Sequence, residues 1–222
     1  MINVKSGLVV WIDVDDVLVK FKAMFHDHIN KIMGLNLSPD YCPTNWNYHE
    51  IFKDDANFLK IFEQLPPDWP LGLMAHSGAK EFTKQLNELG CHVVLITHLR
   101  ESMGIYRLSN LIKHEIYFDE IYFTFHTDKG RYAKEVSKRF RTEQGEIKHV
   151  FIDDRAKNVV DMFKALPLNY AVTLRNEFNV PDIELLALEQ QSGKLSADSS
   201  GVEEMYQKLL NYVRNYQELN KI

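Results

Sequence analysis

Closely spaced acidic residues follow a short apolar run near the N-terminus of the 222-residue chain. Asp13, Asp15 and Asp16 come directly after residues 8–12, which read LVVWI. In an extended chain, residues two apart point to the same side, so Asp13 and Asp15 are predicted to face one site. A lone Asp is commonly solvated, but acids this close to the end of a buried strand indicate a binding or catalytic site.

A second acidic pair, Asp153 and Asp154, follows the apolar run 150–152. If both runs are central parallel strands, the two acidic groups meet at the same edge of the sheet. Carboxylates gathered in this way repel one another, and a hard cation or raised pKa values relieve the repulsion. Oxygen ligands without cysteine favour Mg²⁺ over zinc, so the sequence predicts a magnesium site.

Two further polar residues stand at the ends of predicted strands. Thr97 ends the run 93–96, where a hydroxyl and nearby backbone N–H groups could hold an anion. Lys129 follows the run 121–125, and its charge could offset that of a bound phosphate. Either residue alone is uninformative, because a strand-end Thr is usually a cap and a Lys that opens a helix is usually solvated.

Short apolar runs rich in Val, Ile, Tyr and Phe alternate with helical patterns along the chain. Such runs are typical of strands buried on both faces of a parallel sheet. The predicted strands are 8–12, 93–96, 121–125, 150–152 and 170–174, and the predicted helices are 79–89, 129–140 and 156–166. The alternation predicts an α/β fold with a doubly wound, mainly parallel, Rossmann-like sheet.

Residues 19–75 interrupt this alternation. Helical patterns begin near Phe21 and Asp54, and a loop with two prolines and several aromatic residues lies between them. We therefore expect a small helical cap at 19–75, inserted after the first strand of a core formed by residues 1–18 and 76–190. The aromatic residues of the cap are expected mostly to form its own small core.

The C-terminal segment differs in composition from the rest. Residues 191–201 are polar and contain Gly and Ser, which predicts a linker. Apolar residues at helical spacing over 202–222 predict an amphipathic helix that must dock on the core or on a partner. Docking on the core is the favoured interpretation.

The overall composition limits the classes of partner. Lys and Arg number 26 and Asp and Glu 31, a net charge of −5, which disfavours binding to a nucleic-acid polymer or an anionic membrane. No apolar stretch approaches the roughly 20 residues of a membrane helix, and the N-terminus lacks the pattern of a signal peptide. Cys42 and Cys91 form neither a disulfide framework nor a zinc pattern. Together these features predict a cytoplasmic protein.

The order and placement of the candidate residues resemble the haloacid-dehalogenase-like (HAD) phosphatase superfamily. Its pattern is an apolar strand ending in DxDx(T/V), a strand ending in Thr or Ser, a Lys, and a strand ending in two Asp. The matching residues are, in chain order, Asp13, Asp15, Thr97, Lys129, Asp153 and Asp154. The resemblance covers about residues 8–174, and the C-terminal segment lies outside it.

This resemblance implies a magnesium-dependent phosphomonoester hydrolase that acts through an aspartyl-phosphate intermediate. It makes Asp13 the nucleophile, and Asp15 first the general acid and then the base. It makes Thr97 and Lys129 the residues that bind the phosphoryl group. The implied Mg²⁺ ligands are Asp13, the backbone carbonyl of Asp15, Asp153 and, through water or from further out, Asp154.

A finer resemblance concerns the substrate. The cap after the first strand, its many aromatic residues and the presence of Val17 are similar to features of the 5′(3′)-deoxyribonucleotidase-like branch of the superfamily. This resemblance implies that the small phosphorylated substrate is a nucleotide. Phe21 and Trp46 are then the candidates to stack on its base. His98 and Arg100 are candidates to contact substrate, although a surface-loop role fits each of them as well.

Several features leave alternatives open. Asp16 stands where the superfamily often has Gly, and its role is unassigned. Arg155 and Asn158 follow the second acidic pair and either contact substrate or lie in a surface loop. A different class of function is a HAD-like protein without activity that binds a partner through its cap or C-terminal helix. The presence of all the motif residues favours the enzyme.

Overall fold

A six-stranded parallel sheet forms the centre of the protein in a computed structural model, which describes residues 1–39, 41, 48–124, 128–143, 145–174, 195–199 and 201–220. The strands, in spatial order, are β4 (Glu120–Phe123), β3 (His92–Thr97), β2 (Leu8–Ile12), β6 (Lys148–Asp153), β7 (Leu168–Leu174) and β8 (Leu195–Ser199). This sheet confirms the predicted α/β fold class.

The first apolar run becomes the central strand of the sheet. β2 pairs in parallel with β3 on one side and with β6 on the other, and every residue of β2 is buried. A strand covered on both faces needs apolar side chains at every position, which explains the continuous run. The register places Ile12 opposite Ile152, so Asp13 and Asp153 follow at the same level.

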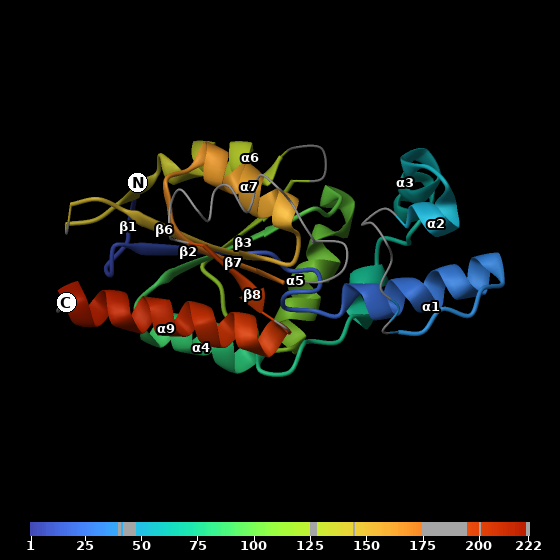
Figure 1. The fold of residues 1–222 in the computed structure, drawn as a ribbon, viewed down its shortest axis with the longest axis horizontal. Helices are drawn as coiled ribbons and strands as arrows, with labels where there is room; N and C mark the ends of the chain where they lie inside the picture. The colour runs from blue at the N-terminus through green and yellow to red at the C-terminus, as the bar shows by residue number, and fades with distance from the viewer. Residues whose placement is uncertain are drawn as a thin grey trace.

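Helices cover both faces of the sheet (Figure 1). On one face lie α4 (Ala79–Glu88) and α9 (Val202–Asn220), and on the other lie α6 (Lys129–Ser137) and α7 (Ala156–Ala165). Alternate residues of β2 point to opposite faces, so Val10 packs in the core beneath α4 and α9 while Trp11 packs beneath α6 and α7. The core therefore has two layers separated by the sheet.

The helical insertion lies where the sequence predicts it. It comprises α1 (Phe21–Met33), α2 (His49–Phe52), α3 (Asp55–Glu63) and the 3₁₀ helix η1 (Trp69–Gly72), and it extends beyond the sheet on the right of Figure 1. An antiparallel bridge between Val19 and Ala75 joins its two ends. Its aromatic rings pack on one another, with ring centroids 5.4 Å apart for Phe21 and Phe25.

Several elements were not predicted. Helix α5 (Gly104–Lys113) and the short 3₁₀ helix η2 (Glu101–Met103) lie between β3 and β4, and β1 (Ile2–Asn3) pairs with β5 (Phe140–Arg141) in a separate two-stranded sheet. The helix predicted over 129–140 ends at Ser137. Phe140 leaves it because its ring is buried against Trp11, 5.9 Å between centroids.

The prediction of an irregular linker over 191–201 is wrong for residues 195–199. These residues form β8, which pairs in parallel with β7 at the edge of the sheet. Backbone hydrogen bonds to a neighbouring strand do not depend on side-chain polarity, and an edge strand tolerates polar residues. A polar composition therefore did not exclude a strand here.

The C-terminal helix α9 docks on the core, as the favoured interpretation expected. Its apolar stripe is buried, and the Tyr206 ring stacks on Phe82 of α4 with centroids 4.2 Å apart. The Tyr206 hydroxyl donates a hydrogen bond to the carbonyl of Val17. Val17 belongs to the loop that follows Asp13, so α9 supports the loop that carries the candidate nucleophile.

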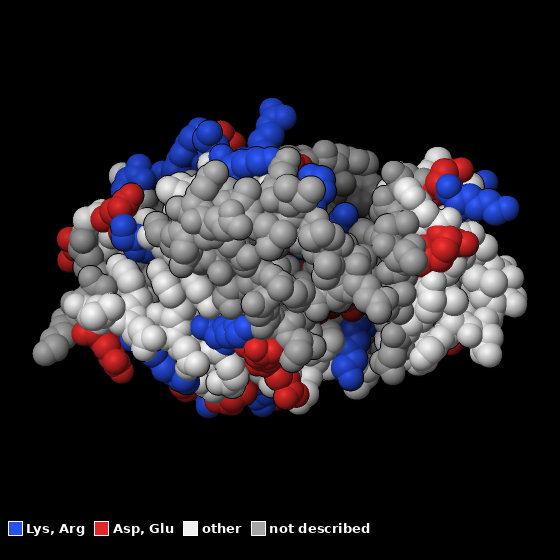
Figure 2. All heavy atoms as spheres, in the orientation of Figure 1, with Lys and Arg blue, Asp and Glu red and all other residues white. Residues whose placement is uncertain are grey.

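The exposed charges are mixed in sign. Figure 2 shows Lys and Arg side chains over α6 and α7, with acidic residues among them. Ion pairs join Lys138 to Glu135 and Lys157 to Asp161 on these helices. Such exposed pairs contribute little to stability, so the two core layers account for most of it. Among the described helices, none has the length and apolarity needed to cross a membrane.

We expect Tyr206→Phe to lower the free energy of unfolding by about 1–2 kcal/mol, because the buried carbonyl of Val17 loses its hydrogen-bond donor. Chemical denaturation measures the loss. Tyr212→Phe is the matched control, since its ring also stacks, on Tyr170, with centroids 4.4 Å apart. Tyr206→Phe should be clearly less stable than Tyr212→Phe. Equal stabilities would mean that the hydrogen bond to Val17 does not contribute to stability.

Candidate functional site

A cavity of about 190 Å³ lies between the carboxyl ends of the central strands and the cap. Its core side is formed by Asp13, Asp15, His98, Lys129, Arg155 and Asn158. Ligands of open α/β sheets bind at this edge, because loops from several parallel strands converge there. The structure thus brings together residues from β2, β3, β6 and α6 that are far apart in the sequence.

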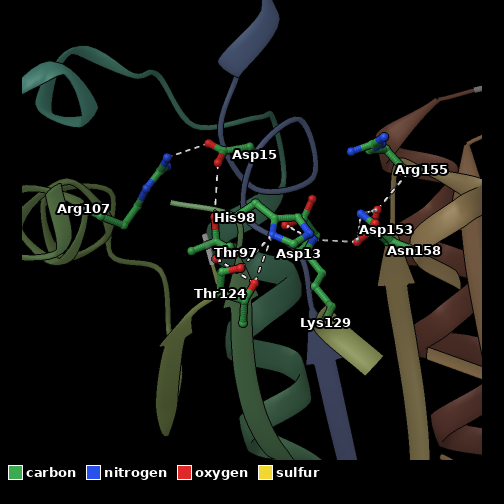
Figure 3. A network of polar contacts seen from close by, with 10 residues as sticks. All are labelled: Asp13, Asp15, Thr97, His98, Arg107, Thr124, Lys129, Asp153, Arg155 and Asn158. Atoms are coloured by element: carbon green, nitrogen blue, oxygen red, sulfur yellow. Dashed lines mark hydrogen bonds and ion pairs between the residues drawn. The ribbon is translucent and has the colours of Figure 1, made fainter. Parts of the chain in front are cut away.

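Asp13, Asp153 and Asp154 form a buried group, and Asp13 places it at the floor of the cavity. Each offers one carboxylate oxygen, and these three atoms lie within 4.8 Å of one another. Lys129 Nζ bridges the group, 2.6 Å from Asp13 Oδ1 and 2.7 Å from Asp153 Oδ2. The Asn158 amide donates to both oxygens of Asp153, at 2.9 and 3.1 Å. Figure 3 shows Asp13, Lys129, Asp153 and Asn158 of this network.

Burial perturbs the ionisation of these groups. It raises the pKa of Asp13 well above its ordinary value, and the neighbouring carboxylates add to the rise while Lys129 opposes it. Burial also raises the pKa of Asp154, to about 7, against the opposing charge of Lys22. Burial would lower the pKa of Lys129, but Asp13 and Asp153 outweigh it and raise that pKa.

These groups fit a hard divalent cation. Converging carboxylate oxygens are the ligands that Mg²⁺ prefers, and Cys91, buried with a pKa raised to about 12, is not part of the group. Burial and the neighbouring carboxylates raise the pKa values of Asp13 and Asp154 although Lys129 and Lys22 oppose the rise. An additional cation at Asp13, Asp153 and Asp154 would also oppose this rise.

Asp15 is held at the side of the cavity by two partners. Its Oδ1 lies 2.5 Å from Arg107, and its Oδ2 accepts a hydrogen bond of 3.2 Å from the Thr97 hydroxyl (Figure 3). Thr97 is fully buried and does not line the cavity itself. In this structure the Thr97 hydroxyl therefore orients Asp15.

Arg107 was missed because α5 was not predicted. Its side chain is fully buried although it carries a charge. The signal in the sequence was an Arg placed one helical turn from both Met103 and Leu111, on the apolar stripe of an amphipathic helix. A charged residue on such a stripe is costly unless it has a buried partner, and that partner is Asp15.

Asp16 connects the core to the start of the cap. Its backbone is left-handed, with φ 56°, which turns the chain after Asp15. Its Oδ1 accepts a hydrogen bond of 3.0 Å from the backbone N–H of Lys22, in the first turn of α1. Lys22 Nζ lies 3.2 Å from Asp154 Oδ2, so a cap lysine that the sequence did not single out also neutralises the acidic group.

Lys129 owes its position to close packing between α6 and α7. Asp128 caps α6 by accepting a hydrogen bond of 2.9 Å from the backbone N–H of Arg131. At Gly130, an added Cβ would lie 2.4 Å from the carbonyl oxygen of Asp161. Only a residue without a side chain allows this approach, which brings the start of α6 to the end of β6.

The predicted substrate residues differ in their placement. His98 lines the cavity. Arg100 does not line it, because its guanidinium donates to the carbonyls of Glu63 and Leu65 at the end of α3 and so joins the cap to the core. Phe21 lines the cavity but is 6% exposed, and its ring packs in the cap core. Trp46 lies outside the described residues.

The cap closes the cavity with a mostly apolar wall. Its lining residues are Phe21, Lys22, Tyr48, Phe58, Leu59 and Phe62. The Phe58 and Phe62 rings stack with centroids 6.1 Å apart. Phe62 is less deeply buried than Phe58, and both line the cavity. The site thus has a charged floor and an aromatic roof.

The structure is similar to solved structures of HAD hydrolases. A haloacid dehalogenase-like hydrolase from Streptococcus pneumoniae aligns with a TM-score of 0.58 at 12% identity, over 94% of this chain and 99% of that one. A HAD family hydrolase from Deinococcus radiodurans, solved with bound phosphate and sodium, aligns with a TM-score of 0.56 at 16% identity, over 94% and 95%.

A predicted phosphatase from Clostridium acetobutylicum aligns with a TM-score of 0.55 at 16% identity, over 91% of this chain and 98% of that one. No protein-family model matches the sequence. No curated protein matches it either. The likeness is therefore one of structure, and it extends over nearly the whole chain and nearly the whole of each neighbour. The chain has the fold of the HAD-superfamily hydrolases.

Proposed function

We propose that this protein is a magnesium-dependent phosphomonoester hydrolase that acts through an aspartyl-phosphate intermediate. The observation that carries the proposal is the buried group of Asp13, Asp153 and Asp154, bridged by Lys129, beside a cavity that Asp13 and Lys129 line. Asp15 stands beside Asp13 with its own ion-pair partner. A structural neighbour was solved with bound phosphate and sodium, which supports a phosphorylated substrate for this fold.

Asp13, Asp153 and Asp154 would hold the Mg²⁺, and the backbone carbonyl of Asp15 is proposed as a further ligand from the HAD resemblance. When bound, the metal supplies compensation for the negative charge of the phosphoryl oxygens. The ammonium group of Lys129 would also compensate the negative charge of the phosphoryl oxygens, because it already lies beside Asp13. The HAD resemblance implies that Thr97 binds the phosphoryl group, but its hydroxyl donates to Asp15, and we propose that it acts by holding that carboxylate.

In the first step, an Asp13 carboxylate oxygen attacks phosphorus and forms a P–O bond. The bond between phosphorus and the ester oxygen breaks, and Asp15 in its protonated form gives its proton to the leaving oxygen. The product alcohol departs and an aspartyl phosphate remains. Carboxylate attack divides the hydrolysis into two steps with lower barriers.

In the second step, Asp15 works in the opposite direction. It takes a proton from water, the water oxygen attacks phosphorus, and the bond from phosphorus to the Asp13 oxygen breaks. Inorganic phosphate leaves, and the Asp13 carboxylate and protonated Asp15 are regenerated. Arg107 and Thr97 hold Asp15 in place throughout, which keeps the proton donor and acceptor at one position.

The apolar roof supports a substrate with a flat or apolar group beyond its phosphate. We therefore propose a nucleoside monophosphate, whose base would lie against the cap. Phe62 is the best-placed ring, because it lines the cavity and keeps part of its surface accessible. Phe21 is largely committed to packing against Phe25 and Trp69.

Asp13→Asn should abolish magnesium-dependent hydrolysis of an aryl phosphate, with a loss of about 10³-fold or more in kcat, because an amide cannot form the intermediate. The fold should remain, since Lys129 keeps Asp153 as a partner and one buried charge is removed. Turnover and thermal melting are measured together. An active Asp13→Asn protein would refute the assignment of the nucleophile.

Chelation should stop activity, and Mg²⁺ should restore it. Mg²⁺ should also raise the melting temperature, because a ligand that binds only the folded state stabilises it. Asp153→Asn should reduce that rise and increase the Mg²⁺ concentration needed for activity, since an amide is a weaker ligand for a hard cation. Asp27→Asn, at an exposed ion pair with Lys31, is the control. Reactivation by zinc alone would contradict a magnesium site.

Phe62→Leu should lower kcat/KM for a nucleoside monophosphate by roughly 5- to 150-fold, the range expected if it removes a base-stacking contact of about 1–3 kcal/mol. Hydrolysis of a small alkyl phosphate should be nearly unchanged. Phe52→Leu is the control, because Phe52 is buried in the cap but does not line the cavity. Equal losses on both substrates would remove the nucleotide preference and leave the phosphatase proposal intact.

A further inference from the structure

His98 stands on the wall of the cavity, directly after Thr97 at the end of β3. The mechanism proposed above gives it no part. Its ring is largely enclosed, and the same cavity is lined by Asp13 and Lys129. A histidine so close to the candidate phosphate site can act as a proton carrier, a donor or an acceptor, and its hydrogen bonds decide which of these roles it can take.

The hydrogen bonds of the ring fix the position of its proton. Nδ1 lies 3.1 Å from the carbonyl oxygen of Thr124, and a carbonyl can only accept (Figure 3). Nδ1 is also 3.2 Å from the Thr124 hydroxyl, which itself donates to the carbonyl of Thr97 at 3.3 Å. Nδ1 must therefore carry a hydrogen that it donates to Thr124.

The ring is neutral near pH 7. Burial lowers the pKa of His98 to about 4, and the positive charge of Lys129 lowers it further, against the opposing effect of Asp153. A neutral imidazole has one N–H, and here that hydrogen is on Nδ1. Nε2 is therefore left with a lone pair and no hydrogen.

The ring lines the cavity, and the part of the chain that the structure describes offers no hydrogen-bond partner to its Nε2. The cations that line the same space, Lys22, Lys129 and Arg155, present N–H donors. His98 instead presents a neutral acceptor, fixed in orientation by Thr124.

We infer that His98 is a specificity residue whose Nε2 accepts a hydrogen bond from a hydroxyl or N–H group that the substrate carries beside its phosphate. The inference rests on the proposed phosphatase function and narrows its substrate class to phosphomonoesters with such a donor. A substrate without the donor leaves Nε2 desolvated and unpaired, which selects against it.

The test uses esters that differ only in the donor. The 2-hydroxyethyl, 3-hydroxypropyl and 4-hydroxybutyl phosphates are each compared with the corresponding methyl ether, which keeps the oxygen but loses the O–H. Affinities are measured by calorimetry with Mg²⁺ and the Asp13→Asn protein, so that binding is observed without turnover. We expect at least one hydroxy ester to bind about 3- to 12-fold more tightly than its ether, as one neutral hydrogen bond provides.

Adding His98→Phe to the Asp13→Asn protein should bring the ratio of hydroxy-ester to ether affinity to about one. Adding His98→Gln instead should restore part of that ratio, because Oε1 of Gln can accept the hydrogen bond in place of Nε2. His76→Phe is the matched control, because His76 is another histidine whose burial lowers its pKa to about 4, and it does not line the cavity. Melting temperatures identify any variant that fails to fold.

The outcomes separate the two proposals. No preference for any hydroxy ester, or a preference that survives in His98→Phe, would overturn the role of His98. An equal loss of affinity for every ester in His98→Phe, with a lowered melting temperature, would overturn it in favour of a structural role. A wild-type protein that binds the esters with the expected ratio but hydrolyses none would refute the phosphatase and leave the acceptor role standing.

Discussion

The buried ion pairs of Lys129 with Asp13 and Asp153 are the interaction on which the rest of the site depends. Removing these charges from water is costly, and the cost is offset only when the partners lie close together and have further hydrogen bonds. The distances of 2.6 and 2.7 Å meet that condition. These short distances require that β2 and β6 be neighbours in register and that Gly130 allow α6 to approach α7 closely.

The loop that begins at Asp13 links this charged group to the cap and to the C-terminal helix. It passes through the left-handed Asp16 and enters the cap at α1. Tyr206 from the C-terminal helix holds it at Val17, and the bridge of Val19 with Ala75 closes the base of the cap. Core, cap and C-terminal helix therefore all constrain the residues next to the candidate nucleophile.

The two sides of the cavity have different physical tasks. The floor concentrates charge, and burial and like-charge repulsion raise the pKa of Asp13, as expected where a cation or a phosphate binds. The roof is a set of aromatic rings that mostly pack on one another and leave part of Phe62 accessible. Charged groups and apolar rings therefore line different sides of the cavity.

The sequence alone determined five strands of the main sheet, because central strands buried on both faces are continuously apolar. It also determined the acids at the ends of β2 and β6, because they directly follow these apolar runs. It also indicated the cap and the C-terminal helix by their periodicity. Only the tertiary structure showed that Arg107 pairs with Asp15 across 92 residues and Lys22 with Asp154 across 132. Such pairs, like the edge strand β8, depend on which elements become neighbours in space, and local patterns of apolar and polar residues do not encode that.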